Sequence, residues 1–198
     1  MPGIDEVRFY LRGLVLLARH DPQGFRFLDL TDRGMMRSFW AIVWCLPAMI
    51  ISWLWRLMLF MDDMPDGFRL GWIFYVRLGL VEAASWIFPL VIVGLMLFAL
   101  GASRFLPAVV TINNWLAVPF SYAYTALLIL LVLVPGAVGL VSLLQLVLVL
   151  LLVTMLFRIL YIICEKQNLM AGTLTMLLLV PSLLLADWLQ RFLGIYPL

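Results

Sequence analysis

Long apolar stretches separated by short polar segments dominate this chain from about residue 35 onwards. Each stretch approaches or exceeds the roughly 20 residues that an α-helix needs to cross a bilayer. The pattern therefore predicts five membrane-spanning helices with short connections. We place these spans at about residues 35–60, 71–100, 115–134, 138–164 and 169–192.

The N-terminal segment, residues 1–34, has a different pattern and predicts an amphipathic helix followed by a linker. At about 100° per residue, the basic side chains of residues 4–20 fall on one side of a helix and the aliphatic ones on the other. The basic stripe consists of Arg8, Arg12 and Arg19. Such a helix is typical of the headgroup region, where it contacts lipid or a partner. A helix packed on the cytoplasmic end of the bundle would have the same pattern, so that alternative stays open.

The composition agrees with a chain whose main solvent is lipid. Of its 198 residues, 66% are hydrophobic and 12% are charged, and the mean hydropathy is +1.12. A soluble domain is about half apolar and about a quarter charged. We therefore expect an all-α integral membrane protein, a five-helix bundle in residues 35–198 preceded by the N-terminal segment. A net charge of +2 argues against a nucleic-acid partner, which requires a concentrated basic patch.

The distribution of charge predicts the orientation of the chain in the membrane. Six arginines lie before the first span or in its first turn, whereas the first loop carries Asp62, Asp63 and Asp66, an acidic group more typical of a solvated loop than of a cation site. By the positive-inside rule, the N-terminus is cytoplasmic and the C-terminus lies across the membrane. All but one of the 13 basic residues are arginine, which hints at a GC-rich bacterial genome. We expect a bacterial cytoplasmic (inner) membrane with a periplasmic C-terminus.

Glu82 is the most informative single residue, because it lies part-way into the second span. An unpaired carboxylate in a membrane is costly and usually faces a partner or water. Arg77 precedes it by five positions, and Arg56 should lie at a similar depth on the first span. One interpretation is an ion or proton site. The interpretation that we favour from the sequence is a structural Arg–Glu pair near the outer interface.

Other polar residues in or near the spans have simpler interpretations. Gln145 is expected to make a hydrogen bond between helices, and Asp187 to pair with Arg191 four residues later. Asn113 and Asn114 fall in the connector before the third span and could line a water-accessible path with Glu82. Prolines inside four of the spans can kink their helices. They are Pro47, Pro89, Pro119 and Pro181.

The motifs of common enzyme classes are missing from the sequence. A single histidine, His20, excludes a multi-histidine metal or haem site, and there is no nucleophile elbow, zinc-protease motif, phosphate-binding loop or dinucleotide-binding motif. We therefore expect no catalytic site, no metal and no cofactor.

Residues 101–135, GASRFLPAVVTINNWLAVPFSYAYTALLILLVLVP, carry the most distinctive pattern. A connector that begins with glycine, a basic residue, the Asn114-Trp115 pair and a proline shortly afterwards resemble the Yip1-like family of membrane proteins. The resemblance implies five spans, a cytoplasmic N-terminal segment, a C-terminus across the membrane and a role without catalysis. Eukaryotic members take part in vesicle traffic and bind small GTPases, but residues 1–34 are too short for us to expect a GTPase partner here.

The leading hypothesis from the sequence is a non-catalytic membrane scaffold or assembly factor. It would act in the lipid bilayer with a membrane-protein partner or as a homo-oligomer. One alternative is a small transporter or channel subunit that uses Glu82 and kinked helices. Another is a lipid-binding or bilayer-shaping protein. The directions in which the intramembrane polar groups point discriminate between the first two hypotheses.

Overall fold

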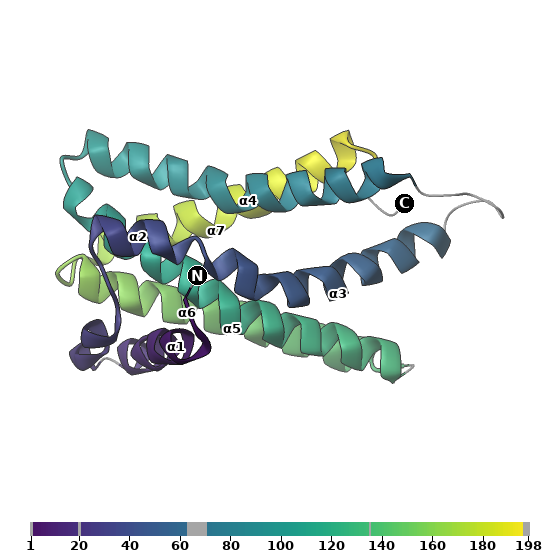
Figure 1. Cartoon of the computed structure of the whole chain (residues 1–198), viewed down its shortest axis with the longest axis horizontal. Helices are drawn as coiled ribbons and strands as arrows, with labels where there is room; N and C mark the ends of the chain where they lie inside the picture. Colours follow the sequence, from purple (N-terminus) through teal and green to yellow (C-terminus); the bar gives the residue numbers. More distant parts are fainter. Residues whose placement is uncertain (1, 20, 63–70, 135, 196–198) are drawn as a thin grey trace.

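The computed structural model describes residues 2–19, 21–62, 71–134 and 136–195, and over these ranges the chain is helical and contains no strand (Figure 1). Two short 3-10 helices accompany the α-helices. The elements are α1 (Ile4–Ala18), η1 (Pro22–Phe27), α2 (Asp32–Ser38), α3 (Ala41–Asp62), α4 (Trp72–Ala99), η2 (Ser103–Phe105), α5 (Leu106–Leu133), α6 (Val138–Ile163) and α7 (Asn168–Phe192).

Five helical stretches are long and apolar enough to cross a membrane. They are Asp32–Met61, which combines α2 and α3, and then Trp72–Ala99, Ser103–Leu133, Val138–Ile163 and Asn168–Phe192. Their mean hydropathy ranges from 1.7 to 2.8. The prediction of an all-helical chain with five apolar helices is therefore confirmed.

The third apolar helix starts much earlier than the sequence pattern indicates. Helix α5 begins at Leu106, whereas the pattern predicts a polar connector up to Asn114 and a span from Trp115. Thr111 and Asn114 are polar, but both are buried inside the bundle, so their polarity does not mark a loop. The first apolar stretch differs too, because a break between Ser38 and Ala41 separates α2 from α3.

The long helices pack on one another in the order α3, α5, α6, α7, α4. Helix α3 packs on α5, α5 on α6, α6 on α7, and α7 on α4, while α2 packs on α5. Figure 1 shows the long helices running side by side, with α1 and α2 near one end. We call this the α1 end. The opposite end, where α3 ends and α4 begins, is the far end.

Helix α1 crosses the bundle instead of running along it, and Figure 1 shows it almost end-on. Its apolar side does not remain open to lipid, because it packs on α5 and α6. Val7, Tyr10, Leu14 and Leu17 are all buried, and Leu17 has no exposed surface. Docking on the bundle, the alternative that the sequence leaves open, is therefore what the structure shows for this side of α1.

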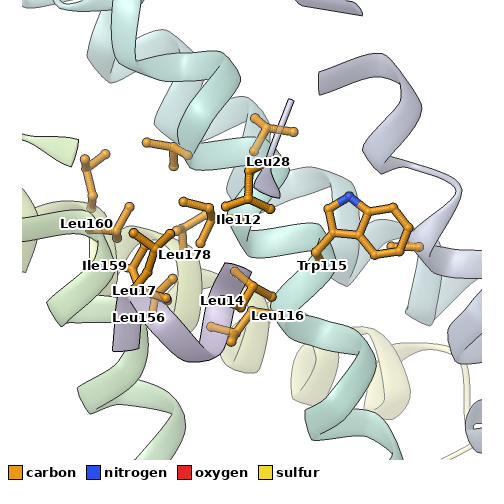
Figure 2. Close-up of a cluster of buried hydrophobic side chains, with 14 of the residues drawn as sticks. Leu14, Leu17, Leu28, Ile112, Trp115, Leu116, Leu156, Ile159, Leu160 and Leu178 are labelled. Carbon is orange, nitrogen blue, oxygen red and sulfur yellow. The ribbon is translucent and has the colours of Figure 1, made fainter. Parts of the chain in front are cut away.

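Buried apolar side chains fill the α1 end of the bundle. Figure 2 shows Leu14 and Leu17 of α1 beside Leu116 of α5 and Leu156 and Ile159 of α6. A smaller cluster at the far end joins α3 to α4, where the Phe60 and Phe74 rings lie 5.1 Å apart between centroids. The larger of the two buried clusters thus lies on the α1 side of the bundle.

Two glycines allow η1 to approach α1. A Cβ atom on Gly13 would lie 2.7 Å from Phe27 Cβ and 2.9 Å from the Gly24 carbonyl oxygen. The second of these atoms belongs to the backbone and cannot move aside without shifting the turn. The α1–η1 hairpin therefore depends on the missing side chain at position 13.

Gly13→Ala should loosen this hairpin. Overpacking against backbone costs about 1–3 kcal/mol, so we expect faster tryptic cleavage after Arg19 and Arg26 in detergent-solubilised protein. Gly139→Ala is the control, because a Cβ atom there meets nothing within 4 Å. Equal cleavage rates in the two variants would contradict the close approach.

Candidate functional site

A polar cavity opens in the far half of the bundle, between α3, α4, α5 and α7. Its volume is about 420 Å³. Leu59 and Gln190 lie at its far-end side, and Ala48 and Ser121 lie toward the middle of their helices. We call it the outer cavity. Its polar lining consists of Ser52, Arg56, Glu82, Ser121, Tyr124, Thr125 and Gln190.

A second cavity of about 220 Å³ lies deeper in the bundle, between α4, α5, α6 and α7. We call it the inner cavity. Its polar lining comes from Glu82, Ser85, Trp86, Asn113 and Ser182, and the rest is mainly leucine. Glu82 lines both cavities, so this one residue of α4 contributes to the walls of the two.

The charges of Glu82 and Arg56 share the outer cavity without pairing. Over the described part of the chain, no hydrogen bond or ion pair reaches either side chain. Both side chains are half-buried, so each keeps some exposed surface. At about 1.5 Å per residue, Glu82 lies about 15 Å along α4 from Trp72, well inside the helix.

The Arg–Glu pair that the sequence favours is therefore not formed. Arg77 points elsewhere, and its Nη1 atom donates a hydrogen bond of 2.7 Å to the Leu193 carbonyl oxygen. Five residues along a helix turn the side chain by about 140° away from its starting direction. Arg77 and Glu82 thus lie on different faces of α4, and Arg77 lines neither cavity.

Ser85 adds unsatisfied acceptors to the inner cavity. Its Oγ atom is buried and has no hydrogen-bond partner among the described residues. Pro89 carries no N–H, so the carbonyl of Ser85, four residues earlier, lacks its usual helical donor. The carboxylate of Glu82 lies one helical turn before Ser85 on the same face. This part of the wall can therefore accept several hydrogen bonds and supplies few donors.

A buried hydrogen-bond network fixes the wall behind the inner cavity. Asn114 is fully buried, and its Nδ2 atom donates to Ser38 Oγ at 2.9 Å. Its Oδ1 atom accepts a hydrogen bond of 2.9 Å from Trp86 Nε1. The single side chain thus joins α5 to α2 and α4. On the outer-cavity side, Thr125 of α5 donates to the Ala48 carbonyl of α3 at 3.1 Å.

The remaining residues singled out from the sequence lie apart from this site, except Asn113, which lines the inner cavity. Gln145 is half-buried on α6 and lines neither cavity. Asp187 pairs with Arg191 at 3.0 Å on the exposed side of α7, as expected. The α1 arginines Arg8, Arg12 and Arg19 are all exposed. Asp63, Asp66 and His20 lie outside the described residues.

The serines, threonine and tyrosine that line the cavities were not predicted as site residues from the sequence. The signal that could have found them is helical spacing. Ser52 and Arg56 lie four positions apart on α3, as do Ser121 and Thr125 on α5. Each pair marks one face of its helix. No spacing in the sequence relates α3 to α5. Only the tertiary structure therefore shows that the two pairs face the same cavity.

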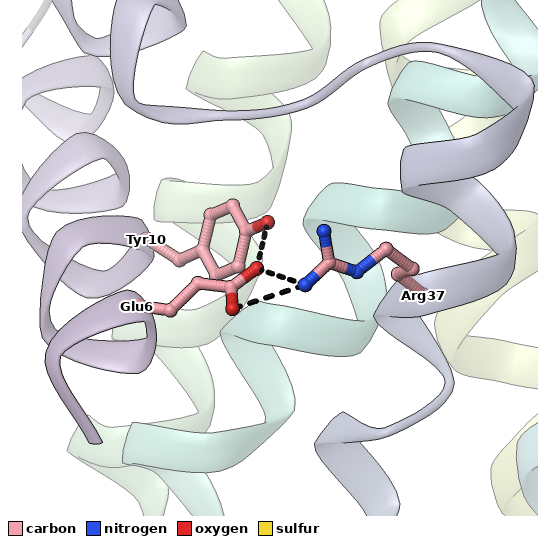
Figure 3. Close-up of polar contacts among 3 residues, drawn as sticks. All are labelled: Glu6, Tyr10 and Arg37. Atoms are coloured by element: carbon pink, nitrogen blue, oxygen red, sulfur yellow. Dashed lines mark hydrogen bonds and ion pairs between the residues drawn. The ribbon is translucent and has the colours of Figure 1, made fainter. Parts of the chain in front are cut away.

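Polar contacts hold α1 against α2 and α5 at the closed end. Figure 3 shows Arg37 Nη2 donating to both oxygens of Glu6, at 2.7 and 3.0 Å, and the Tyr10 hydroxyl donating to Glu6 at 2.9 Å. The Tyr10 ring also stacks on Trp115 with centroids 4.6 Å apart. Burial, reinforced by the bond to Glu6, raises the pKa of Tyr10 to about 12, so this hydroxyl remains a donor at neutral pH.

No protein-family model, curated protein or solved structure matches this chain. Within the described ranges, no group of three or more His, Cys, Asp or Glu side chains is placed to hold a metal ion. The two cavities and their unpaired charges are therefore the features that bear on function.

Asn114→Leu should destabilise the bundle, because it leaves Trp86 Nε1 without its acceptor. Loss of a buried hydrogen bond costs about 1–2 kcal/mol in such settings. We expect a lower midpoint of thermal unfolding in detergent micelles. Asn113→Leu is the matched control, since Asn113 makes no hydrogen bond to a described residue and should affect the midpoint much less. Similar losses in both variants would argue against the network.

Proposed function

We propose that this protein is a small membrane carrier that binds a polar ligand in the outer and inner cavities. The observation that carries the proposal is that Arg56 and Glu82, on two different helices, line one cavity and pair neither with each other nor with any other described residue. A charge inside a membrane-spanning bundle usually marks a ligand or ion path. Cavities of about 300–1,000 Å³ are the usual size for small-molecule sites.

The two ends of the bundle differ in a way that favours a carrier over a channel. The outer cavity occupies the far half, and the inner cavity continues toward the α1 end as far as Leu116 and Leu156, which belong to the buried apolar cluster there. A carrier binds its ligand with access from one side at a time, while an open channel needs a continuous polar path. Prolines at Pro47, Pro89 and Pro119 lie on helices that line the cavities and offer sites for helix bending.

The orientation and location of the carrier follow from the charge distribution. We propose that the α1 end, with most of the basic residues, is cytoplasmic, so the outer cavity opens to the periplasm of a bacterial inner membrane. The likeness of residues 101–135 to the Yip1-like family stays a prediction. It agrees with a five-span, non-enzymatic protein and does not specify a ligand.

A scaffold remains the second proposal, and one observation favours it. Arg8, Arg12 and Arg19 stay exposed on α1 after its apolar side has docked on the bundle. This basic face can contact anionic headgroups or an acidic partner. It is compatible with a carrier, and it provides no reason for two unpaired charges in a cavity.

Cysteine labelling tests whether the outer cavity is open to water. In a background with Cys45 and Cys164 replaced by alanine, Ser121→Cys should react with a membrane-impermeant methanethiosulfonate in native membranes. Ala126→Cys is the control, on the exposed, lipid-facing side of α5. Because only a hydrated thiolate reacts well, we expect a rate at least about tenfold higher for Ser121→Cys.

The side from which the reagent is added separates carrier from channel. A carrier resting in this state should be labelled in sealed right-side-out vesicles and much less in inverted ones, because the buried apolar cluster of α1, α5 and α6 separates Ser121 from the α1 end. Equal labelling from both sides would favour a channel. If Ser121→Cys reacts no faster than Ala126→Cys, the cavity is not hydrated and the carrier proposal fails.

A further inference from the structure

We propose that the ligand of these cavities is a zwitterion with a primary ammonium group and an anionic group, its ammonium toward Glu82 and Ser85 and its anion toward Arg56. This inference rests on the proposed function and names the chemistry of the ligand. It follows from the distribution of charges, donors and acceptors along the two cavities, which differs between their ends.

Among the described residues, the fixed charges of the lining sum to zero. Within those ranges Arg56 and Glu82 are the only charged side chains that line the two cavities, and they have opposite signs. A ligand with one charge would satisfy one of them and leave the other without a counter-charge in a poorly solvated site, which costs free energy. A zwitterion satisfies both at once. The lining therefore favours a ligand with both charges over a simple cation or anion.

The acceptors around Glu82 favour a primary ammonium over a quaternary one. A primary ammonium carries three N–H donors. Near the start of the inner cavity, three acceptors lie along one turn of α4: the Glu82 carboxylate, the unpartnered Ser85 Oγ and the Ser85 carbonyl freed by Pro89. A quaternary ammonium has no N–H and would leave the two Ser85 acceptors unsatisfied.

The donors of the outer cavity fit the anionic group. The Arg56 guanidinium presents a planar set of N–H donors that matches a carboxylate or a phosphodiester. The Tyr124 hydroxyl and the Gln190 side-chain amide line the same cavity and can add donors. Since Arg56 lies on α3 and Glu82 on α4, a ligand that joins them also joins the two helix pairs α3–α5 and α4–α7.

Two sources could supply this chemistry: a free amphoteric molecule, or the headgroup of an aminophospholipid. Glycerophosphoethanolamine represents the first and phosphatidylethanolamine the second. Their counterparts, glycerophosphocholine and phosphatidylcholine, keep the charges and lose every ammonium N–H. Phosphatidylglycerol keeps the phosphodiester and has no cation.

The experiment measures binding to the purified full-length protein in an uncharged maltoside detergent. Soluble probes are titrated by tryptophan fluorescence, since Trp55 lines the outer cavity and Trp86 the inner one. Lipid probes are counted by native mass spectrometry. We expect the ethanolamine form to bind at least about tenfold more tightly than the choline form, since each lost hydrogen bond to a charged group costs that much or more. This comparison uses only the unaltered protein.

Two variants then test which charge of the protein contacts which charge of the ligand. Glu82→Gln should abolish the preference for the ethanolamine form over phosphatidylglycerol, and Arg56→Gln should weaken binding of every phosphodiester probe. Matched controls are Asp187→Asn and Arg77→Gln, which change the same charges on residues that line neither cavity. Both controls should bind like the unaltered protein.

Each outcome bears on the proposal. Preference for glycerophosphoethanolamine supports a free ligand, and preference for phosphatidylethanolamine alone supports a lipid ligand. Equal binding of ethanolamine and choline forms, or no binding of either, overturns the ligand class. In that case the labelling of Ser121→Cys tests the carrier proposal separately. If the cysteine is labelled, the cavity is hydrated and the protein can be a carrier of another ligand. If the cysteine is not labelled, both the carrier proposal and the zwitterion proposal are wrong.

Discussion

A carboxylate about 15 Å along a helix that is long and apolar enough to span a membrane must meet a counter-charge, a hydrogen-bond donor or water, because an apolar environment solvates it poorly. Glu82 is the residue on which this constraint acts most strongly. Among the described residues it has no partner, and it lines two adjoining cavities instead. Much of the arrangement around it follows: polar faces of α3, α4 and α5 turn inward, and apolar faces turn outward.

The α1 end of the bundle contains most of the buried apolar side chains. Helix α1 contributes Leu14 and Leu17 to the buried cluster and is held by the Glu6–Arg37 ion pair, whose partners remain partly exposed. An exposed pair of this kind contributes about 1 kcal/mol or less. Burial of the apolar side of α1 contributes roughly 1.5–3 kcal/mol for each large side chain, so it does more than the ion pair to hold the helix in place.

The buried network of Asn114 connects the two halves. It ties α5 to α2 at the α1 end and to Trp86, which lines the inner cavity. A change in the packing of α2 and α1 on the bundle would therefore alter the wall of the inner cavity. In a carrier, coupling of this kind is needed between the closed end and the binding cavity, because access must alternate between them.

The sequence alone determined the helical class and the five apolar helices, because a run of about 20 apolar residues has few other stable structures. It also marked Glu82 as unusual. The sequence pattern placed the start of α5 too late, because Asn114 is polar and a polar residue indicates a loop when its buried hydrogen-bond partners are unknown. The sequence also favoured an ion pair between Glu82 and an arginine, which is not formed among the described residues. Only the tertiary structure decided that Arg56, Glu82 and Ser85 face shared cavities, because contacts between helices distant in the chain leave no local pattern.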